Sequence, residues 1–416
     1  MNPQVKCLGV DCHFMKYLFL WVAIALSFAL QACGGGGGGS STGSSSGASP
    51  ASDLQSSSYG YKAAIAQLAP QVQISAITGL TVSDADTRNV VTFGDFFQEG
   101  PGALSAFVMV NQAGGARPFF LKRMGSSWVD KTSDVLVATT GCGQASSAIT
   151  ADFNGDGRHD VFVTCKDGTG ESQWLFISNA TTKFFQKMAL QSPSGTAFTF
   201  KATQAAAADI NSDGVMDLVV AEPTSGLKFL LGTAPASTTA PTYTLAPTRL
   251  INGVLTSGHT LPTGIQGVQL IPNASSRFDL IVMGNSSNGF PTWRITGSAD
   301  TSVGTASPGT FFYFQDAYAK AFPVGSDISA PWIATDVFID GGVYYLNLFR
   351  SDRPNQMTLA KVDLNLTGEI AARQTSAVTS DGVSARLFPT SSGIVTFDGD
   401  CPLAGSASRC GVVFNK

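Results

Sequence analysis

Three aspartates and one asparagine are crowded into nine residues of the stretch ADFNGDGRHDVFV, which runs from Ala151 to Val163. Oxygen-bearing side chains at this density support two kinds of chemistry. Two carboxylates can act as acid and base on a substrate, or several oxygens can coordinate a hard cation such as calcium. Only 13% of the chain is charged, so the rest of the sequence has to explain why acids gather here.

A second copy of the stretch favours the cation. ADINSDGVMDLVV, from Ala208 to Val220, repeats the spacing 57 residues later (209 − 152). An active site, such as a glycosidase pair with carboxyls about 5 to 9.5 Å apart, is normally built once, whereas this constellation recurs with its glycine and its following apolar strand. The candidate ligands are Asp152, Asn154, Asp156 and Asp160 in the first copy and Asp209, Asn211, Asp213 and Asp217 in the second.

The pattern Asp-x-Asn-x-Asp-Gly-x-x-Asp, followed by an apolar strand, resembles the calcium-binding loop of FG-GAP or VCBS repeats. Such repeats occur in integrin α-subunit propellers and in many bacterial surface proteins. The resemblance implies calcium as cofactor, with the backbone carbonyls of Arg158 and Val215 completing the two ligand sets. Gly157 permits the sharp turn that the loop needs. Because packed carboxylates repel one another, we expect each loop to loosen without the ion.

Four other stretches look like worn copies of the repeat, and they keep few of the acids. The retained residues are Asp95 and Gly100 in the first, Asp279 in the second, Asp336, Asp340 and Gly341 in the third, and Asp398 and Asp400 in the last. Tyr344 stands where the last acid of the third of these copies would be. Whether the copies near Asp95, Asp336 and Asp398 bind calcium is left open.

Between the motifs, short alternating or apolar runs are bounded by Gly, Ser, Asn and Thr, which predicts about four strands per unit. Four strands are the content of one propeller blade. We therefore predict an all-β fold, a β-propeller of six four-stranded blades over residues 59–416, with seven blades as the alternative. The segment from about Tyr61 to Phe93 would supply the strands that the final copy lacks.

The N-terminal part reads as an export signal and not as part of the fold. An apolar run from Tyr17 to Leu30 is followed by Leu-Gln-Ala-Cys, which resembles a bacterial lipobox and implies acylation of Cys33. We expect a signal peptide over 1–32, with Met15 as the preferred start, and a flexible Gly/Ser linker over 33–58. Gly34 after the cysteine implies an outer-membrane lipoprotein, on the periplasmic face or the cell surface. The alternative is an ordinary secretory signal with an incidental Cys33.

Four cysteines remain once Cys7, Cys12 and Cys33 are set aside, and an even number in an exported protein predicts two disulfides. Four cysteines allow three connectivities. The favoured pairs are Cys142 with Cys165, which bracket the first acidic motif, and Cys401 with Cys410, which are neighbours across a loop.

Few other side chains suggest catalysis. His159 lies inside the first acidic loop, where the second copy has Met216, and we expect it to be a solvent-facing spacer. His259 stands alone in a loop, and no partners for a zinc site or a catalytic triad are found. Four tryptophans could stack on sugars, but we expect them to be core residues: Trp128, Trp174, Trp293 and Trp332.

The charge balance limits the function classes. The net charge of −4 comes without any run of Lys or Arg, which argues against a nucleic-acid partner. The favoured function is a non-enzymatic, calcium-stabilised adhesion or binding module, monomeric and anchored to the membrane by lipid, for a glycan or protein partner. The alternatives are an extracellular polysaccharide hydrolase or lyase with its site in the propeller's central channel, and an envelope assembly factor.

Overall fold

The computed structural model describes residues 90–414 with interruptions, the longest of which are 247–262, 398–410 and 300–311. All described residues belong to one of two compact units, Ala48–Lys416. The predicted signal peptide, Cys33, the linker and residues 61–89 lie outside the described residues. So do His259, Asp398, Asp400, Cys401 and Cys410.

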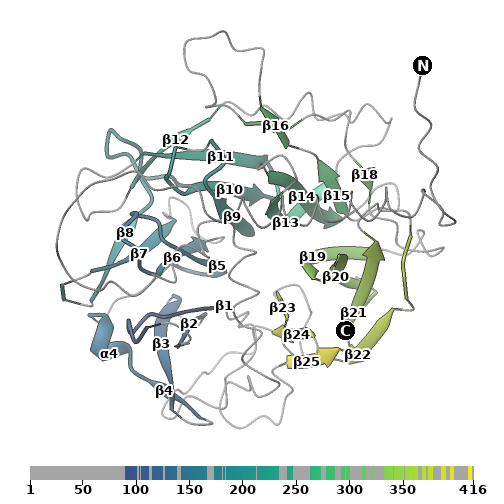
Figure 1. Cartoon of the computed structure of the whole chain (residues 1–416), viewed down its shortest axis with the longest axis horizontal. Helices are drawn as coiled ribbons and strands as arrows, with labels where there is room; N and C mark the ends of the chain where they lie inside the picture. The colour runs from purple at the N-terminus through teal and green to yellow at the C-terminus, as the bar shows by residue number, and fades with distance from the viewer. Residues whose placement is uncertain are drawn as a thin grey trace, which may run out of the picture. The chain divides into compact units, whose positions relative to one another are not determined.

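Strands in antiparallel sheets dominate the described chain (Figure 1), as the sequence predicts. Its one described helix is a single turn, α4 (Thr132–Val135). Three sheets each contain four strands that are consecutive in the chain. The first sheet has β1 (Val90–Gly94), β2 (Ser105–Val110), β3 (Arg117–Met124) and β4 (Ser127–Asp130); the second has β5 (Ala145–Ala151), β6 (Asp160–Cys165), β7 (Trp174–Ser178) and β8 (Phe185–Ala189); the third has β9 (Gln204–Ala208), β10 (Asp217–Glu222), β11 (Gly226–Thr233) and β12 (Thr242–Leu245).

The following strands repeat this arrangement with more irregularity. Two groups of four strands are joined into one eight-stranded sheet by a single pair of residues, Asn285 in β14 and Ile333 in β19. The fourth group has β13 (Thr263–Pro272), β14 (Phe278–Asn285), β15 (Thr292–Ile295) and β18 (Lys320–Ala321); the fifth has β19 (Trp332–Asp340), β20 (Val343–Arg350), β21 (Arg353–Asp363) and β22 (Gln374–Ala377). A three-stranded sheet contains β23 (Arg386–Pro389), β24 (Ile394–Phe397) and β25 (Gly411–Phe414), and a small ribbon pairs β16 (Gly297–Ala299) with β17 (Phe312–Phe314).

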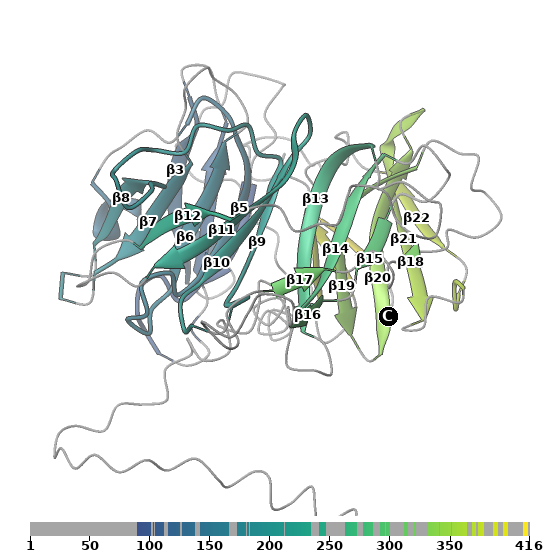
Figure 2. The same cartoon turned by 90° about the horizontal axis from the view of Figure 1, so that it is seen from above.

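The first strand of each group packs beside the first strand of the next. Contacts link β1 to β5, β5 to β9, β9 to β13, β13 to β19 and β19 to β23. Figure 2 shows β5 and β9 of this series side by side. Successive groups therefore pack on one another in chain order, and each sheet between the ends has two neighbours.

Two buried faces explain why the second strands of the sheets are mostly apolar. In β10, Leu218 and Val220 face a cluster shared with Phe162 of the second sheet. Val219, between them, faces a cluster shared with Val268 of the fourth group. Successive side chains of a strand point to opposite faces, so a sheet between two neighbours favours apolar residues on both faces.

Aromatic rings fill the space between the first two sheets. Phe120 stacks on Phe185 with ring centroids 4.5 Å apart, and the centroids of Phe107 and Phe176 are 5.3 Å apart. Cys142 and Cys165 lie in the same cluster and form a disulfide with a Cα–Cα distance of 5.9 Å. This is the first of the two cysteine pairs that the sequence favours.

The tryptophans are core residues, as expected, and not exposed platforms. Trp128, Trp293 and Trp332 are buried. Trp174 is half-buried, and the Lys187 ammonium lies 3.7 Å from its ring centroid.

Within the described residues, no helix is long and apolar enough to cross a membrane.

Candidate metal centre

The two acidic motifs form the loops that connect the first and second strands of the second and third sheets. Pairing closes at Ala151 opposite Asp160 before the first loop and at Ala208 opposite Asp217 before the second. The two loops therefore occupy equivalent places in successive sheets.

The first loop is organised by hydrogen bonds from its backbone to its own acids. The Asp152 carboxylate accepts from the backbone nitrogens of Asp156 (3.0 Å) and Gly157 (2.8 Å). The side-chain oxygen of Asn154 also accepts from Asp156 N (3.1 Å), and the Asp156 carboxylate accepts from Arg158 N (3.0 Å). Short acceptor side chains commonly fold a turn in this way. The backbone thereby holds its first three polar side chains in a fixed loop.

The second loop repeats this network contact by contact. Asp209 accepts from the nitrogens of Asp213 (3.0 Å) and Gly214 (2.9 Å). Asn211 accepts from Asp213 N (3.1 Å), and Asp213 accepts from Val215 N (2.9 Å). The sequence repeat is therefore also a repeat of local geometry.

Left-handed backbone conformations explain the glycines. Gly157 and Gly214 have φ values of 82° and 85°, a region that costs other residues free energy. Gly155 has φ 74°, and Gln98, at the same place in the worn copy of the first sheet, has φ 57°. Gln98 is the only non-glycine residue with positive φ among those described. The first sheet has therefore kept the shape of this turn after losing most of its acids.

The last acid of each motif accepts hydrogen bonds that hold the start of its strand in place. Asp160 is fully buried, and its two carboxylate oxygens accept from Phe153 N in the loop (3.0 Å) and Ser178 N at the end of β7 (2.7 Å). Asp217 accepts in the same way from Ile210 N (2.9 Å) and Gly232 N (2.8 Å). These acids therefore connect the loop, the second strand and the third strand.

Burial disfavours the ionised forms of the last acids of the two loops. Burial raises the pKa of Asp217 to about 7, backbone hydrogen bonds oppose this, and the Asp213 carboxylate adds to it. Burial likewise raises the pKa of Asp160 well above its usual value, and Asp156 and Asp152 raise it further. A cation near either loop would favour the ionised forms.

The donor set matches calcium in chemistry, because every candidate ligand is a carboxylate, amide or carbonyl oxygen. In the part of the chain that the structure describes, however, no three His, Cys, Asp or Glu side chains come together as a ready metal site. The Asn154 amide nitrogen donates to the Asp156 carboxylate at 3.2 Å, and Asn211 donates to Asp213 at 2.9 Å. An ion would therefore have to use amide and backbone oxygens and rearrange these contacts.

His159 is not the solvent-facing spacer that the sequence suggests. It is buried, and its Nδ1 accepts from Asp95 N at 2.7 Å. Burial lowers its pKa from 6.5 to about 4, so the ring is neutral at pH 7. The sequence prediction is wrong because the neighbouring sheet covers this residue, and no local pattern announces that contact. Met216, its counterpart, is also buried.

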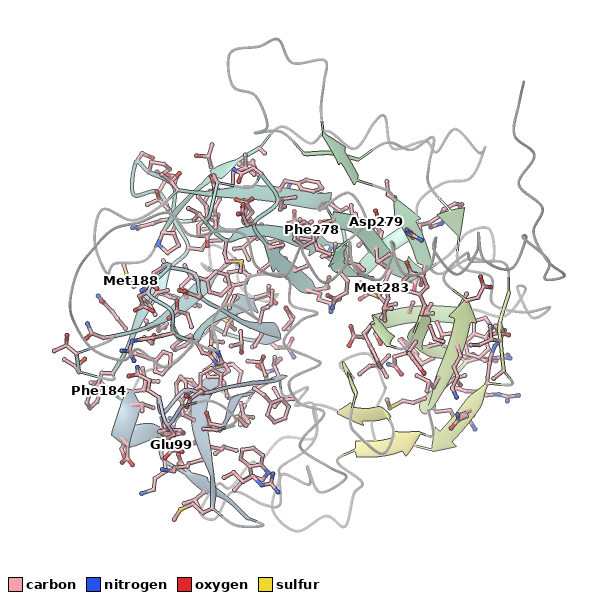
Figure 3. The ribbon with its side chains drawn as sticks, in the orientation of Figure 1. Glu99, Phe184, Met188, Phe278, Asp279 and Met283 are labelled. Carbon is pink, nitrogen blue, oxygen red and sulfur yellow. A yellow bond between two sulfur atoms is a disulfide. The ribbon has the colours of Figure 1, made fainter. Side chains whose placement is uncertain are left out.

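Two of the worn copies use their remaining acids differently. Asp279 (Figure 3), which the sequence aligns with Asp217, lies in β14 next to the closing pair of Pro272 and Phe278. Its carboxylate accepts from Arg294 Nε of β15 at 2.6 Å. Asp336 is not in a loop at all, which corrects its interpretation as the first acid of a worn copy. It lies within β19, because β19 and β20 are joined by a tight hairpin that closes at Asp340 opposite Val343.

The buried Asp336 carboxylate accepts from Gln269 Nε2 of β13 (3.1 Å) and from Leu387 N of β23 (2.8 Å). It thereby ties three successive groups of strands together. Thr335 and Asp336 interrupt the apolar residues of β19, and no local pattern predicts which distant groups this carboxylate contacts.

The part of the chain that matches a known protein family is the part that contains the two acidic loops. No curated protein matches the chain. Residues 152–220 match the FG-GAP-like repeat family, and this segment begins with the first acidic loop and ends in the strand after the second. This segment of the chain therefore carries an FG-GAP-like repeat.

Proposed function

We propose that this protein is a non-enzymatic binding module that presents a rigid face to a glycan or protein partner. Its scaffold is a β-propeller that calcium stabilises at two loops. The observation that carries the proposal is the duplication of one hydrogen-bonded acidic loop at the same place in successive sheets. A scaffold element is repeated whenever its sheet is repeated, whereas a catalytic site needs one particular arrangement.

Six blades account for the strand groups: the three four-stranded sheets, the two halves of the eight-stranded sheet, and the three-stranded sheet of β23 to β25. The chain-order contacts between first strands support a radial arrangement. Each blade then buries both faces against its neighbours, which a single sheet cannot do alone.

Calcium would be held in the first loop by Asp152, Asn154, Asp156, the Arg158 carbonyl and Asp160. In the second loop the corresponding residues are Asp209, Asn211, Asp213, the Val215 carbonyl and Asp217. The ion would supply positive charge at a place where acids are buried beside other acids. The chain's own part is to fix the turn through the Asp152 and Asp209 hydrogen bonds and to exclude water around the last acid.

The location proposed is the cell envelope, with a lipid on Cys33 and the linker of 33–58 separating the propeller from an outer membrane. The buried Cys142–Cys165 disulfide agrees with an oxidising compartment. Labelling cells with a radioactive fatty acid would test the anchor, because Cys33→Ser should remove the label while leaving the chain exported.

The binding function is tested by running a glycan array beside a polysaccharide-degradation assay, with calcium and with EDTA. We expect retention of a partner without turnover, and weaker retention in EDTA. Asp213→Ala should weaken retention, while Asp352→Ala, at an exposed carboxylate that forms an ion pair with the nearby Arg350, is the matched control. Turnover of a sugar polymer would overturn the proposal in favour of the hydrolase or lyase.

A further inference from the structure

The first sheet carries a loop of the same shape as the two acidic loops, but with different side chains at its key places. The Asp95 carboxylate accepts from Glu99 N and Gly100 N, both at 2.9 Å. These are the fourth and fifth residues after Asp95, as Asp156 and Gly157 are after Asp152. Gly100 has φ 104°. The first sheet therefore keeps the fold of the turn.

Strand register identifies what replaces the last acid. Pairing closes at Gly94 opposite Ser105, which corresponds to Ala151 opposite Asp160. Ser105 Oγ accepts from Phe96 N at 2.8 Å, just as Asp160 accepts from Phe153 N. The loop is two residues longer, since 105 − 94 is 11 and 160 − 151 is 9. A neutral hydroxyl therefore stands where the other loops bury a carboxylate.

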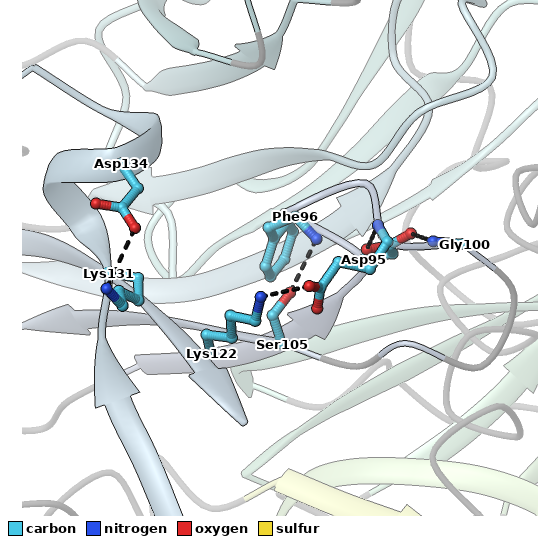
Figure 4. Close-up of polar contacts among 8 residues, drawn as sticks. Asp95, Phe96, Gly100, Ser105, Lys122, Lys131 and Asp134 are labelled. Atoms are coloured by element: carbon cyan, nitrogen blue, oxygen red, sulfur yellow. Dashed lines mark hydrogen bonds and ion pairs between the residues drawn. The ribbon is translucent and has the colours of Figure 1, made fainter. Parts of the chain in front are cut away.

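A cation of the protein itself reaches this loop from the third strand. Lys122 of β3 is paired with Ser105, so its side chain lies on the same face of the sheet. Its Nζ forms an ion pair with the Glu99 carboxylate (Figure 4). The same Nζ lies 5.9 Å from the ring centroid of Phe97. Phe97 and Glu99 occupy the places of Asn154 and Asp156. The ammonium is therefore held by the two side chains that stand at ligand positions in the other loops.

The same register position carries no charge in the sheets with intact loops. Counting one residue back from the printed pairs, Asp160 faces Ile177 and Asp217 faces Leu231. Ile177 is buried and Leu231 is half-buried. In the fourth group a cation of the third strand again lies beside an acid. Arg294 of β15 forms an ion pair with the buried Asp279. A cation of the third strand therefore pairs with a retained acid in both the first sheet and the fourth group.

We propose that Lys122 takes the place of the calcium ion in the first sheet, so that this loop is held by a tethered ammonium and not by a metal. The proposal rests on calcium binding by the two intact loops. Arg294 would do the same for Asp279 in the fourth group. The described part of the chain would then bind two calcium ions, and the blades flanking the intact pair would stay folded when calcium is removed.

An exchange of residues between sheets tests the proposal by calorimetric titration with CaCl₂ and by thermal unfolding with and without EDTA. Leu231→Lys should place an ammonium beside the second intact loop. We expect the dissociation constant of one of the two ions to rise at least tenfold, and the calcium-dependent rise in melting temperature to shrink. Leu231→Gln, which is polar but neutral, is the matched control and should behave as the wild type.

The reciprocal change keeps the test decisive if Leu231→Lys fails to fold. Lys122→Gln removes the ammonium that pairs with Glu99, so the calcium-dependent rise in melting temperature should exceed that of the wild type. Lys122→Arg should restore wild-type behaviour. Wild-type binding in both Leu231→Lys and Lys122→Gln would overturn the proposal while leaving the two metal loops intact. A wild-type chain that binds no calcium would overturn the proposed function as well.

Discussion

The calcium-free protein should lose stability as the pH rises from about 4 to 7, and Asp217 is the residue that lets this be measured. Its pKa is 3.8 in the unfolded chain and about 7 in the folded one, so the folded state holds the proton more tightly. The difference of about 3 pH units corresponds to about 4 kcal/mol of unfolding free energy at 1.36 kcal/mol per unit. This stability is present below pH 4 and is lost as the pH passes 7.

The assay is urea unfolding in EDTA at pH 5 and pH 8, on the wild type and on Asp217→Asn, which stays uncharged. His159 has the opposite dependence, because its pKa falls from 6.5 to about 4 on folding, and it contributes equally in both proteins. Subtracting the variant's pH dependence from that of the wild type therefore isolates Asp217. A difference that is flat, or that favours the wild type at pH 8, would refute the assignment of a buried, protonated carboxyl.

Three further changes probe other parts of the structure. Asp213→Ala should remove about half of the melting-temperature shift that calcium produces, measured by differential scanning fluorimetry, and an unchanged shift would argue against a metal at the second loop. Asp336→Ala leaves the Gln269 amide and the Leu387 nitrogen without their acceptor and should lower the unfolding free energy by about 1 to 3 kcal/mol per unmet group; a loss below about 0.5 kcal/mol in chemical denaturation would contradict its connecting role. Replacing Cys142 and Cys165 together by alanine should cost about 3 kcal/mol, since the disulfide spans 23 residues, and equal stability of variant and wild type would show that the bond contributes nothing.

Much of the fold follows from local sequence. The second strands are recognisable because both of their faces are buried, which leaves unbroken apolar runs such as Val161–Val163 after each acidic motif. The turn itself is encoded by Asp152 and Gly157, whose roles depend only on neighbours within five residues. The four-strand repeat and the acidic loops could therefore be predicted.

What could not be predicted depends on pairing between distant strands. Ser105 is found only through the register of β1 and β2, because two extra residues displace it from the 57-residue alignment. Lys122 reaches the loop only because β3 pairs with β2. His159 is buried by a neighbouring sheet, and Asp336 lies within a strand because a tight hairpin replaces the loop.

The central claim is that the repeated acids hold ions. The most direct measurement is diffraction from crystals grown in millimolar CaCl₂, using anomalous scattering to locate calcium. Two anomalous peaks are predicted, one within ligand distance of Asp156 and one within ligand distance of Asp213, and none beside Glu99. Crystals that show no peak at either loop, with the acids still hydrogen-bonded only to the backbone, would contradict the account.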